Sequence, residues 1–150
     1  MKRPVVVIVG PTASGKTGVA IKLAKRIDGE IIAADSRTIY RGMNVGTAKP
    51  TKAEQGDVVH YGFDLVEPDE RFTVYDWKNY AEQKINEIRV KGKTPIVVGG
   101  TGLYVDALVY DYQFGRDEKK NCTDRKEMQP GFLMYGIKWD VKVILQTIGI

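Results

Sequence analysis

The chain has 150 residues, of which 43% are hydrophobic and 28% are charged, and its formal net charge is +4. This composition excludes collagen-like and intrinsically disordered proteins. A chain of this length can bury roughly 68–70% of its unfolded surface in one core. A single cysteine, Cys122, excludes a disulfide framework and a multi-cysteine zinc site. We therefore expect one cytoplasmic domain over residues 1–150, a monomer that does not bind membranes.

Short apolar runs alternate with amphipathic stretches over residues 1–110, which form the core of the predicted domain. This alternation predicts an α/β fold, in which helices flank a parallel sheet. Thr73, followed three residues later by Asp76, is a typical helix N-cap. The predicted strands cover residues 5–9, 30–34 and 95–98, with a weaker one at 58–65, and the predicted helices cover 16–27, 73–90 and 103–110.

The remaining 40 residues lack this regular pattern. Residues 111–130 carry mixed charges without periodicity, and we interpret them as a connector. Residues 131–150 predict one more strand over 132–139, then a short helix that begins at Val141 after an Asp140 cap.

Three other features bear on function only weakly. The sequence pI of about 9.1 permits a nucleic acid or phosphate partner without requiring one. His60, the only histidine, lies in the weak strand and favours neither a metal site nor a catalytic role. The aromatic residues Trp77 and Tyr80 fall on a predicted helix, where we expect them to pack in the core.

The strongest motif is GPTASGKT at residues 10–17, which matches GxxxxGK[ST] between a predicted strand and a predicted helix. Such loops wrap backbone N–H groups around phosphate, and the N-terminus of the following helix favours negative charge. Lys16, expected at the surface, would add a positive charge, and the Thr17 hydroxyl would ligate Mg²⁺. The motif predicts a site for a diphosphate or a nucleotide such as ATP, made of Gly10, Pro11, Thr12, Ala13, Ser14, Gly15, Lys16 and Thr17.

Asp35 directly follows the second predicted strand. Ligands bind at the carboxyl ends of strands in open α/β sheets, so a carboxylate there is a candidate general base or Mg²⁺ organiser. A helix cap for the following turn is the structural alternative.

Four blocks in order resemble the tRNA dimethylallyltransferase (isopentenyltransferase) family. They are GPTASGKT at 10–17, ADSR-IYRGMNVGTAKP at 34–50, EPDERFTVYDW at 67–77 and VVGGTGLYVDAL at 97–108. The resemblance implies a P-loop NTPase-like sheet. It also implies Mg²⁺-assisted transfer of a dimethylallyl group from dimethylallyl diphosphate to the exocyclic amine of the adenine next to the anticodon in tRNA.

The resemblance also implies individual roles. Asp35 would be the general base, and Thr101 would lie beside the reacting centre. The tRNA would contact Ser36, Arg37 and Thr38, besides Asp35 and Thr101. Thr38 departs from the pattern, because the family usually has glutamine there. The target adenine is expected to flip out of its stack, since its amine is otherwise unreachable.

The length departs further from the family pattern. Members are considerably longer and carry a helical insertion that surrounds the anticodon stem. We expect this chain to lack most of that insertion and to have the connector at 111–130 in its place. The arginines that clamp the diphosphate have no visible match. We therefore expect weak tRNA binding. Three alternatives stay open: transfer to a free adenine nucleotide, an inactive diphosphate- or nucleotide-binding remnant, and a small-molecule P-loop kinase.

Overall fold

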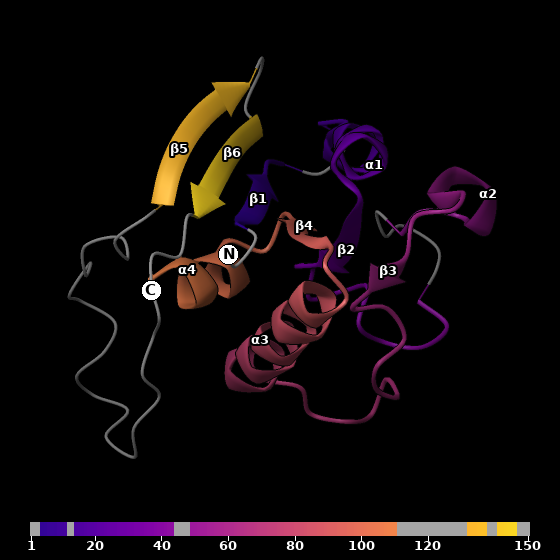
Figure 1. Ribbon diagram of the computed structural model, residues 1–150. Helices are drawn as coiled ribbons and strands as arrows, with labels where there is room; N and C mark the ends of the chain where they lie inside the picture. Colours follow the sequence, from indigo (N-terminus) through magenta and orange to yellow (C-terminus); the bar gives the residue numbers. More distant parts are fainter. Residues whose placement is uncertain (1–3, 12–13, 44–48, 111–131, 138–140, 147–150) are drawn as a thin grey trace.

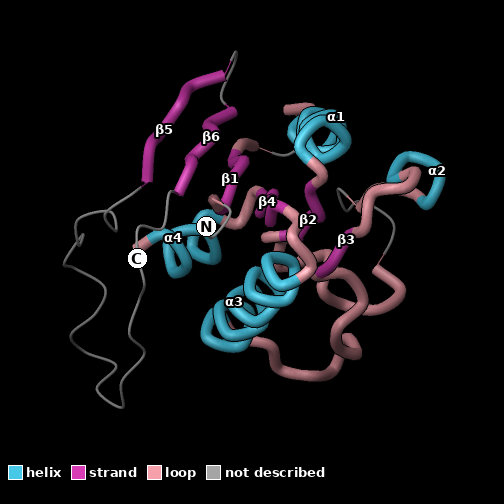
Figure 2. Tube along the Cα trace, viewed as in Figure 1, coloured by secondary structure: helices cyan, strands magenta, loops and turns pink. Residues whose placement is uncertain are grey.

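The computed structural model describes residues 4–11, 14–43, 49–110, 132–137 and 141–146. Its centre is a six-stranded sheet with the order β3-β2-β4-β1-β6-β5 (Figures 1 and 2). The strands are β1 (Val5–Val9), β2 (Gly29–Ala33), β3 (His60–Tyr61), β4 (Thr94–Gly99), β5 (Phe132–Ile137) and β6 (Val141–Gln146). The helices are α1 (Lys16–Ile27), α2 (Lys52–Gln55), α3 (Val74–Val90) and α4 (Gly102–Val109).

Four of the strands form the predicted parallel sheet. β4 lies between β1 and β2, and β3 extends β2 at the outer edge; all of these pairs are parallel. Because the strands run in one direction, their carboxyl ends meet at one edge of the sheet. The loops after β1, β2 and β4 therefore lie close together there.

The continuous apolar runs in these strands are explained by helices on both faces of the sheet. Successive strand residues point to opposite faces. Val5 and Val7 pack with the buried residues of α3 and α4, whereas Val6 and Ile8 pack with α1. Figure 1 shows α1 on one side of the strands, with α3 and α4 on the other.

Local signals explain where the helices begin. α1 starts at Lys16 as predicted, directly after the glycine-rich loop. The Thr73 hydroxyl and the Asp76 carboxylate form the predicted reciprocal capping box at the start of α3. A second capping box, between Thr51 and Glu54, begins the four-residue helix α2, which our sequence analysis did not predict.

The predicted helix from Val141 is wrong, because this segment forms strand β6. β6 pairs antiparallel with both β1 and β5, so the sheet is mixed rather than wholly parallel. The segment VKVILQ is rich in β-branched residues. It also supplies hydrogen-bond partners to a buried edge of β1 that would otherwise lack them. The connector at 111–130 and the cap Asp140 lie outside the described residues.

The predicted strand at 58–65 shortens to the two residues of β3. Past this strand, pairing resumes only as a single parallel bridge between Tyr40 and Val66. Among the described residues, no helix is long and apolar enough to cross a bilayer.

Candidate functional site

The loop between β1 and α1 brings the first predicted site residues together. Gly15 has φ of +79°, a left-handed conformation that glycine adopts without steric cost. Lys16 follows as the first residue of α1. Thr12 and Ala13, the other predicted members of this loop, lie outside the described residues.

Lys16 is buried, and the expectation that it lies at the surface is wrong. Only 4% of the residue is exposed, and its Nζ donates a hydrogen bond to the Pro11 carbonyl at 3.0 Å. Burial lowers the pKa of Lys16, while the charge of Asp35 opposes that shift. The side chain thus turns inward beneath the loop, and its charge is held in a partly desolvated place facing Asp35.

The ends of β2 and β4 approach each other unusually closely. A Cβ added at Gly99 would collide with the Ala34 carbonyl, so only glycine fits there. The Ala34 N–H donates to the Val98 carbonyl at 2.7 Å, and the Thr101 N–H donates to the Ala34 carbonyl at 3.2 Å. This approach carries Thr101 across to the turn that follows β2.

Thr101 and that turn are joined by side-chain hydrogen bonds. The Ser36 N–H donates to Thr101 Oγ1 at 2.9 Å, and Thr101 Oγ1 donates to Ser36 Oγ at 3.4 Å. Asp35 Oδ1 accepts from the Arg37 N–H at 2.9 Å. Asp35 therefore does form the local cap that was its structural alternative, with one carboxylate oxygen, and this cap fixes the orientation of the carboxylate.

Thr38 and Arg37 point in opposite directions. Thr38 is buried, and its hydroxyl donates to the Asp35 carbonyl at 3.1 Å. Arg37 is exposed. Of the predicted tRNA contacts, Arg37 is therefore on the outer surface, whereas Thr38 faces the interior.

Aromatic packing supports the turn from the other face of the sheet. Trp77 is fully buried, and its Nε1 donates to the Ala33 carbonyl at 3.0 Å. Tyr104 stacks on it with 4.9 Å between ring centroids. Burial, together with the nearby Tyr40 and Asp35, raises the pKa of Tyr104 to about 12. The phenol therefore stays neutral at physiological pH.

A pocket extends from the P-loop between α1 and the sheet. We call it the inner pocket. At one end are the polar residues Lys16, Thr17, Asp35 and Thr38. The rest of the lining is largely apolar and comprises Ala20, Ile31, Ala33, Pro50, His60, Phe63, Val98 and Gly99.

Sequence analysis missed His60 as a residue of this site. Its position in a weak strand carries no signal that distinguishes it from a packed core histidine. Pairing of β3 with β2 places it opposite Ile31, and both residues line the inner pocket. The position of His60 in the site follows from its partner in the sheet, Ile31, and not from its neighbours in the sequence.

A wider, basic groove lies on the outer side of the P-loop. It shares Lys16, Thr17 and Pro50 with the inner pocket, and Lys22, Lys25 and Lys49 add positive charge along it. Lys49 is also paired with Asp64 at 2.6 Å. A cationic groove of this kind attracts anionic ligands to the P-loop.

The residues present suit Mg²⁺ held jointly with a phosphate ligand. Within the described ranges, no group of three or more His, Cys, Asp or Glu side chains could form a protein cage for a metal. Mg²⁺ commonly uses one or two protein oxygens plus substrate phosphates and water. Thr17 and Asp35 line the same pocket and offer such oxygens. Ser14 Oγ, in the loop, is buried without a hydrogen-bond partner in the described structure, as expected of a loop shaped for a ligand.

The family models give a consistent assignment. A model described as IPP transferase matches residues 38–134, and one described as isopentenyl transferase matches residues 3–59. These two spans cover both the P-loop and the Thr101 segment.

Individual proteins agree with the family models. The tRNA dimethylallyltransferase of Bacillus pumilus is 50% identical over 127 residues, which are 85% of this chain and 40% of that protein. The Staphylococcus carnosus protein of the same name is 54% identical over 75% of this chain and 36% of its own length. The crystal structure of a tRNA isopentenylpyrophosphate transferase from Bacillus halodurans aligns with a TM-score of 0.73 and 46% identity, covering 77% of this chain and 38% of that one.

The chain spans about two fifths of the length of the curated relatives it matches. Over that part, the match includes the loop that holds Lys16, the turn that holds Asp35 and the β4–α4 segment that holds Thr101. Sequence, fold and site lead to one assignment: the chain belongs to the IPP transferase family.

Proposed function

We propose that this chain carries the donor-binding and proton-accepting half of a tRNA dimethylallyltransferase. The reaction moves a dimethylallyl group from dimethylallyl diphosphate to the exocyclic amine of the adenine next to the anticodon. One observation carries the proposal: Lys16 and Asp35 line one end of a pocket whose remainder is largely apolar. A diphosphate with a short apolar tail is complementary to that arrangement.

The donor is bound by two different kinds of contact. The P-loop amides and Lys16 hold the diphosphate, whose negative charge grows as it leaves. The five-carbon tail extends into the inner pocket between α1 and the sheet. When bound with the donor, Mg²⁺ neutralises the charge that develops on the diphosphate. Thr17, whose hydroxyl follows Lys16 in the loop motif, is the residue that would hold it.

The acceptor amine approaches from the Asp35–Thr101 side. The bond between the prenyl carbon and the diphosphate oxygen breaks, and a bond from that carbon to the adenine nitrogen forms. The amine must lose a proton in this step, and the free oxygen of Asp35 accepts it. Its other oxygen is occupied by the Arg37 N–H, so the carboxylate is held in place. Thr101, joined to Ser36, lines the approach beside it.

The acceptor is proposed from the relatives, whose names specify tRNA. Arg37 is exposed next to Asp35 and is positioned to contact RNA phosphates. We propose that the acting unit is a monomer in the cytoplasm.

The decisive experiment is transfer from labelled dimethylallyl diphosphate. The chain is incubated with Mg²⁺ and, in separate reactions, an anticodon stem-loop, AMP, or ATP without prenyl donor. We expect label in the stem-loop only when it carries the target adenine. Label in AMP alone would identify a free nucleotide as the acceptor. Phosphoryl transfer from ATP to a small molecule would indicate a kinase, and donor binding without any transfer would indicate an inactive remnant.

A binding series tests the tRNA half of the proposal. Tight binding of an RNA stem requires many contacts to phosphates, and each contact makes the affinity depend more strongly on salt concentration. We expect the stem-loop to bind this chain weakly and with strong salt sensitivity, whereas the donor binds well. Tight binding that depends on the target adenine would show that residues 1–150 carry a complete recognition surface.

A further inference from the structure

Gly100 directly follows β4 and is exposed, and its backbone conformation does not require a glycine. Its φ lies outside the left-handed region that side chains avoid. The preceding residue, Gly99, differs in this respect, because a Cβ there would collide with the Ala34 carbonyl. The fold therefore requires glycine at position 99 but not at position 100.

The side chain that Gly100 lacks would lie against Lys16. A Cβ added at Gly100 is 3.7 Å from Lys16 Nζ, 3.9 Å from Lys16 Cε and 3.3 Å from the Gly10 carbonyl oxygen. The first two distances are ordinary van der Waals contacts, and the third requires the loop to move by a few tenths of an ångström. A methyl group at this position is thus compatible with the fold, but it covers one side of the ammonium.

The Lys16 ammonium has few open sides on which a ligand can bind. Only 4% of the residue is exposed, and one of its three N–H groups donates to the Pro11 carbonyl. A phosphate oxygen that accepts from another N–H group would lie about 2.8 Å from Nζ. On the side of Gly100, such an oxygen would occupy the space that a methyl group fills.

Gly100 also joins the two halves of the site. It lies beside the Lys16 side chain and directly precedes Thr101, whose Oγ1 accepts from the Ser36 N–H at 2.9 Å. The prenyl carbon must lie between the diphosphate, held at Lys16, and the acceptor amine, which approaches from Asp35 and Thr101. The diphosphate oxygen bonded to that carbon is thus brought to the side of Lys16 that faces Gly100.

We propose that Gly100 is a positioning residue, whose missing side chain leaves room for the diphosphate oxygen next to the prenyl carbon to bond Lys16. When the carbon–oxygen bond breaks, the electron pair stays on this oxygen, and the ammonium stabilises the charge that develops there. The carbon bonds to the adenine nitrogen, whose proton passes to Asp35. This inference rests on the proposed function, because it places the diphosphate of the donor in the P-loop.

The test is a double-mutant cycle that measures the affinity for inorganic pyrophosphate with Mg²⁺ by calorimetric titration. We expect Gly100→Ala to lower the affinity of the wild type about tenfold, the lower end of the range for a hydrogen bond to a charged group. In the Lys16→Met background the same substitution should change the affinity by less than about twofold, because no ammonium remains to be covered. A general distortion of the loop would instead weaken binding in both backgrounds.

Gly102→Ala is the matched control, since an added Cβ at Gly102 meets no described atom within 4 Å. Its pyrophosphate affinity should equal that of the wild type. Thermal melts establish that each variant is folded. An affinity of Gly100→Ala close to that of the wild type, or an equal loss in both backgrounds, would overturn the role of Gly100 while leaving the proposed function intact. If the wild-type chain does not bind pyrophosphate, both the proposed function and this inference are wrong.

Discussion

The two edges of the parallel sheet, where its strands begin and where they end, differ in how well their buried polar groups are supplied with partners. At the edge where the strands begin, Glu30 is 3% exposed and fully engaged. Its carboxylate accepts from the Tyr61 hydroxyl at 2.8 Å and pairs with Lys91 at 3.1 Å and Lys93 at 3.2 Å. At the edge where the strands end, Lys16 is buried and its Nζ donates to the Pro11 carbonyl, and Ser14 Oγ is buried with no hydrogen-bond partner in the described structure.

The difference separates stability from function. A buried charge depends on its partners, so breaking such a cluster destabilises the fold. Buried polar groups left unsatisfied reduce stability, and they persist where a ligand satisfies them. The two edges share the same strands, so the comparison can be made with matched substitutions at either end.

The largest expected effect is on turnover, at the edge where the strands end. Asp35→Asn keeps the shape of the side chain but cannot accept a proton, so we expect turnover to fall by about 10²–10⁴-fold. Donor affinity should change little. The measurement is single-turnover transfer to an anticodon stem-loop, with calorimetry for the donor.

Asp28→Asn is the control for this change, because Asp28 follows α1 at the opposite edge and is exposed. It should not affect transfer. Weaker donor binding with normal turnover in Asp35→Asn would instead make Asp35 a Mg²⁺ organiser.

The next effect is on anion binding. Lys16→Met should weaken the binding of inorganic pyrophosphate with Mg²⁺ by at least about 30-fold, because a desolvated charge pair is lost. The melting temperature should stay constant or rise, since methionine fills the site without a buried charge. Titration calorimetry and a thermal melt measure the two quantities.

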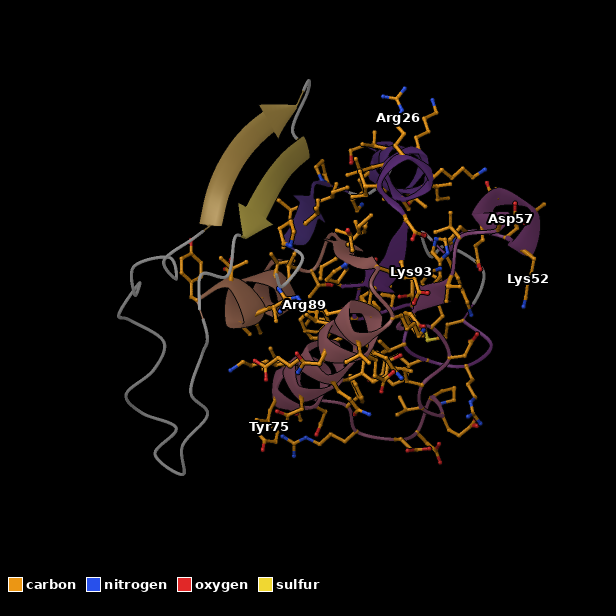
Figure 3. The ribbon with its side chains drawn as sticks, in the orientation of Figure 1. Arg26, Lys52, Asp57, Tyr75, Arg89 and Lys93 are labelled. Atoms are coloured by element: carbon orange, nitrogen blue, oxygen red, sulfur yellow. The ribbon has the colours of Figure 1, made fainter. Side chains whose placement is uncertain are left out.

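Arg26→Met tests whether the loss is local to the loop. Arg26 projects outward from the last turn of α1 (Figure 3), so its substitution removes equal charge from the same helix. Its pyrophosphate affinity should be nearly that of the wild type. An equal loss in both variants would mean that overall charge, and not the loop, determines binding.

At the opposite edge the expected effect is on stability alone. Glu30→Gln should lower the free energy of unfolding by about 1–3 kcal/mol, the range for hydrogen bonds to a charged group. Lys91 and Lys93 are 46% and 35% exposed and can turn to solvent, which limits the loss. Urea unfolding measures it, and pyrophosphate binding should be unchanged.

Glu87→Gln is the matched control, since Glu87 pairs with Lys84 at the surface and contributes less than about 1 kcal/mol. A loss in Glu30→Gln no larger than this would mean that the buried cluster contributes nothing beyond a surface pair.

The smallest effect is a difference in pH dependence. Burial alone would raise the pKa of Glu30, but hydrogen bonds from Tyr61, Lys91 and Lys93 outweigh it and lower the pKa below its ordinary value of 4.5. A carboxyl with a lowered folded-state pKa stabilises the protein above the unfolded value and loses that contribution as the pH falls through the folded value. The stability difference between wild type and Glu30→Gln should therefore be constant from pH 7 to about pH 5 and shrink below 4.5. A difference that grows in acid would contradict this assignment.

Much of the fold and part of the site follow from local sequence. Helix α1 begins and ends where its apolar spacing and the glycine-rich loop predict. The Thr73–Asp76 capping box can likewise be predicted from the sequence, because both partners lie within one turn. The P-loop is recognisable for the same reason, since its chemistry is carried by eight consecutive residues.

Other features were decided only by contacts between distant segments. Val141–Gln146 became a strand because β1 offered an open edge, which no local pattern reveals. Lys16 was buried by the closeness of the loops around it. His60 entered the inner pocket only when β3 paired with β2. The sequence by itself determined the short-range signals of helix, cap and phosphate loop, whose partners are a few residues apart. The tertiary structure decided burial and strand pairing, because these depend on which surfaces meet after the chain has folded.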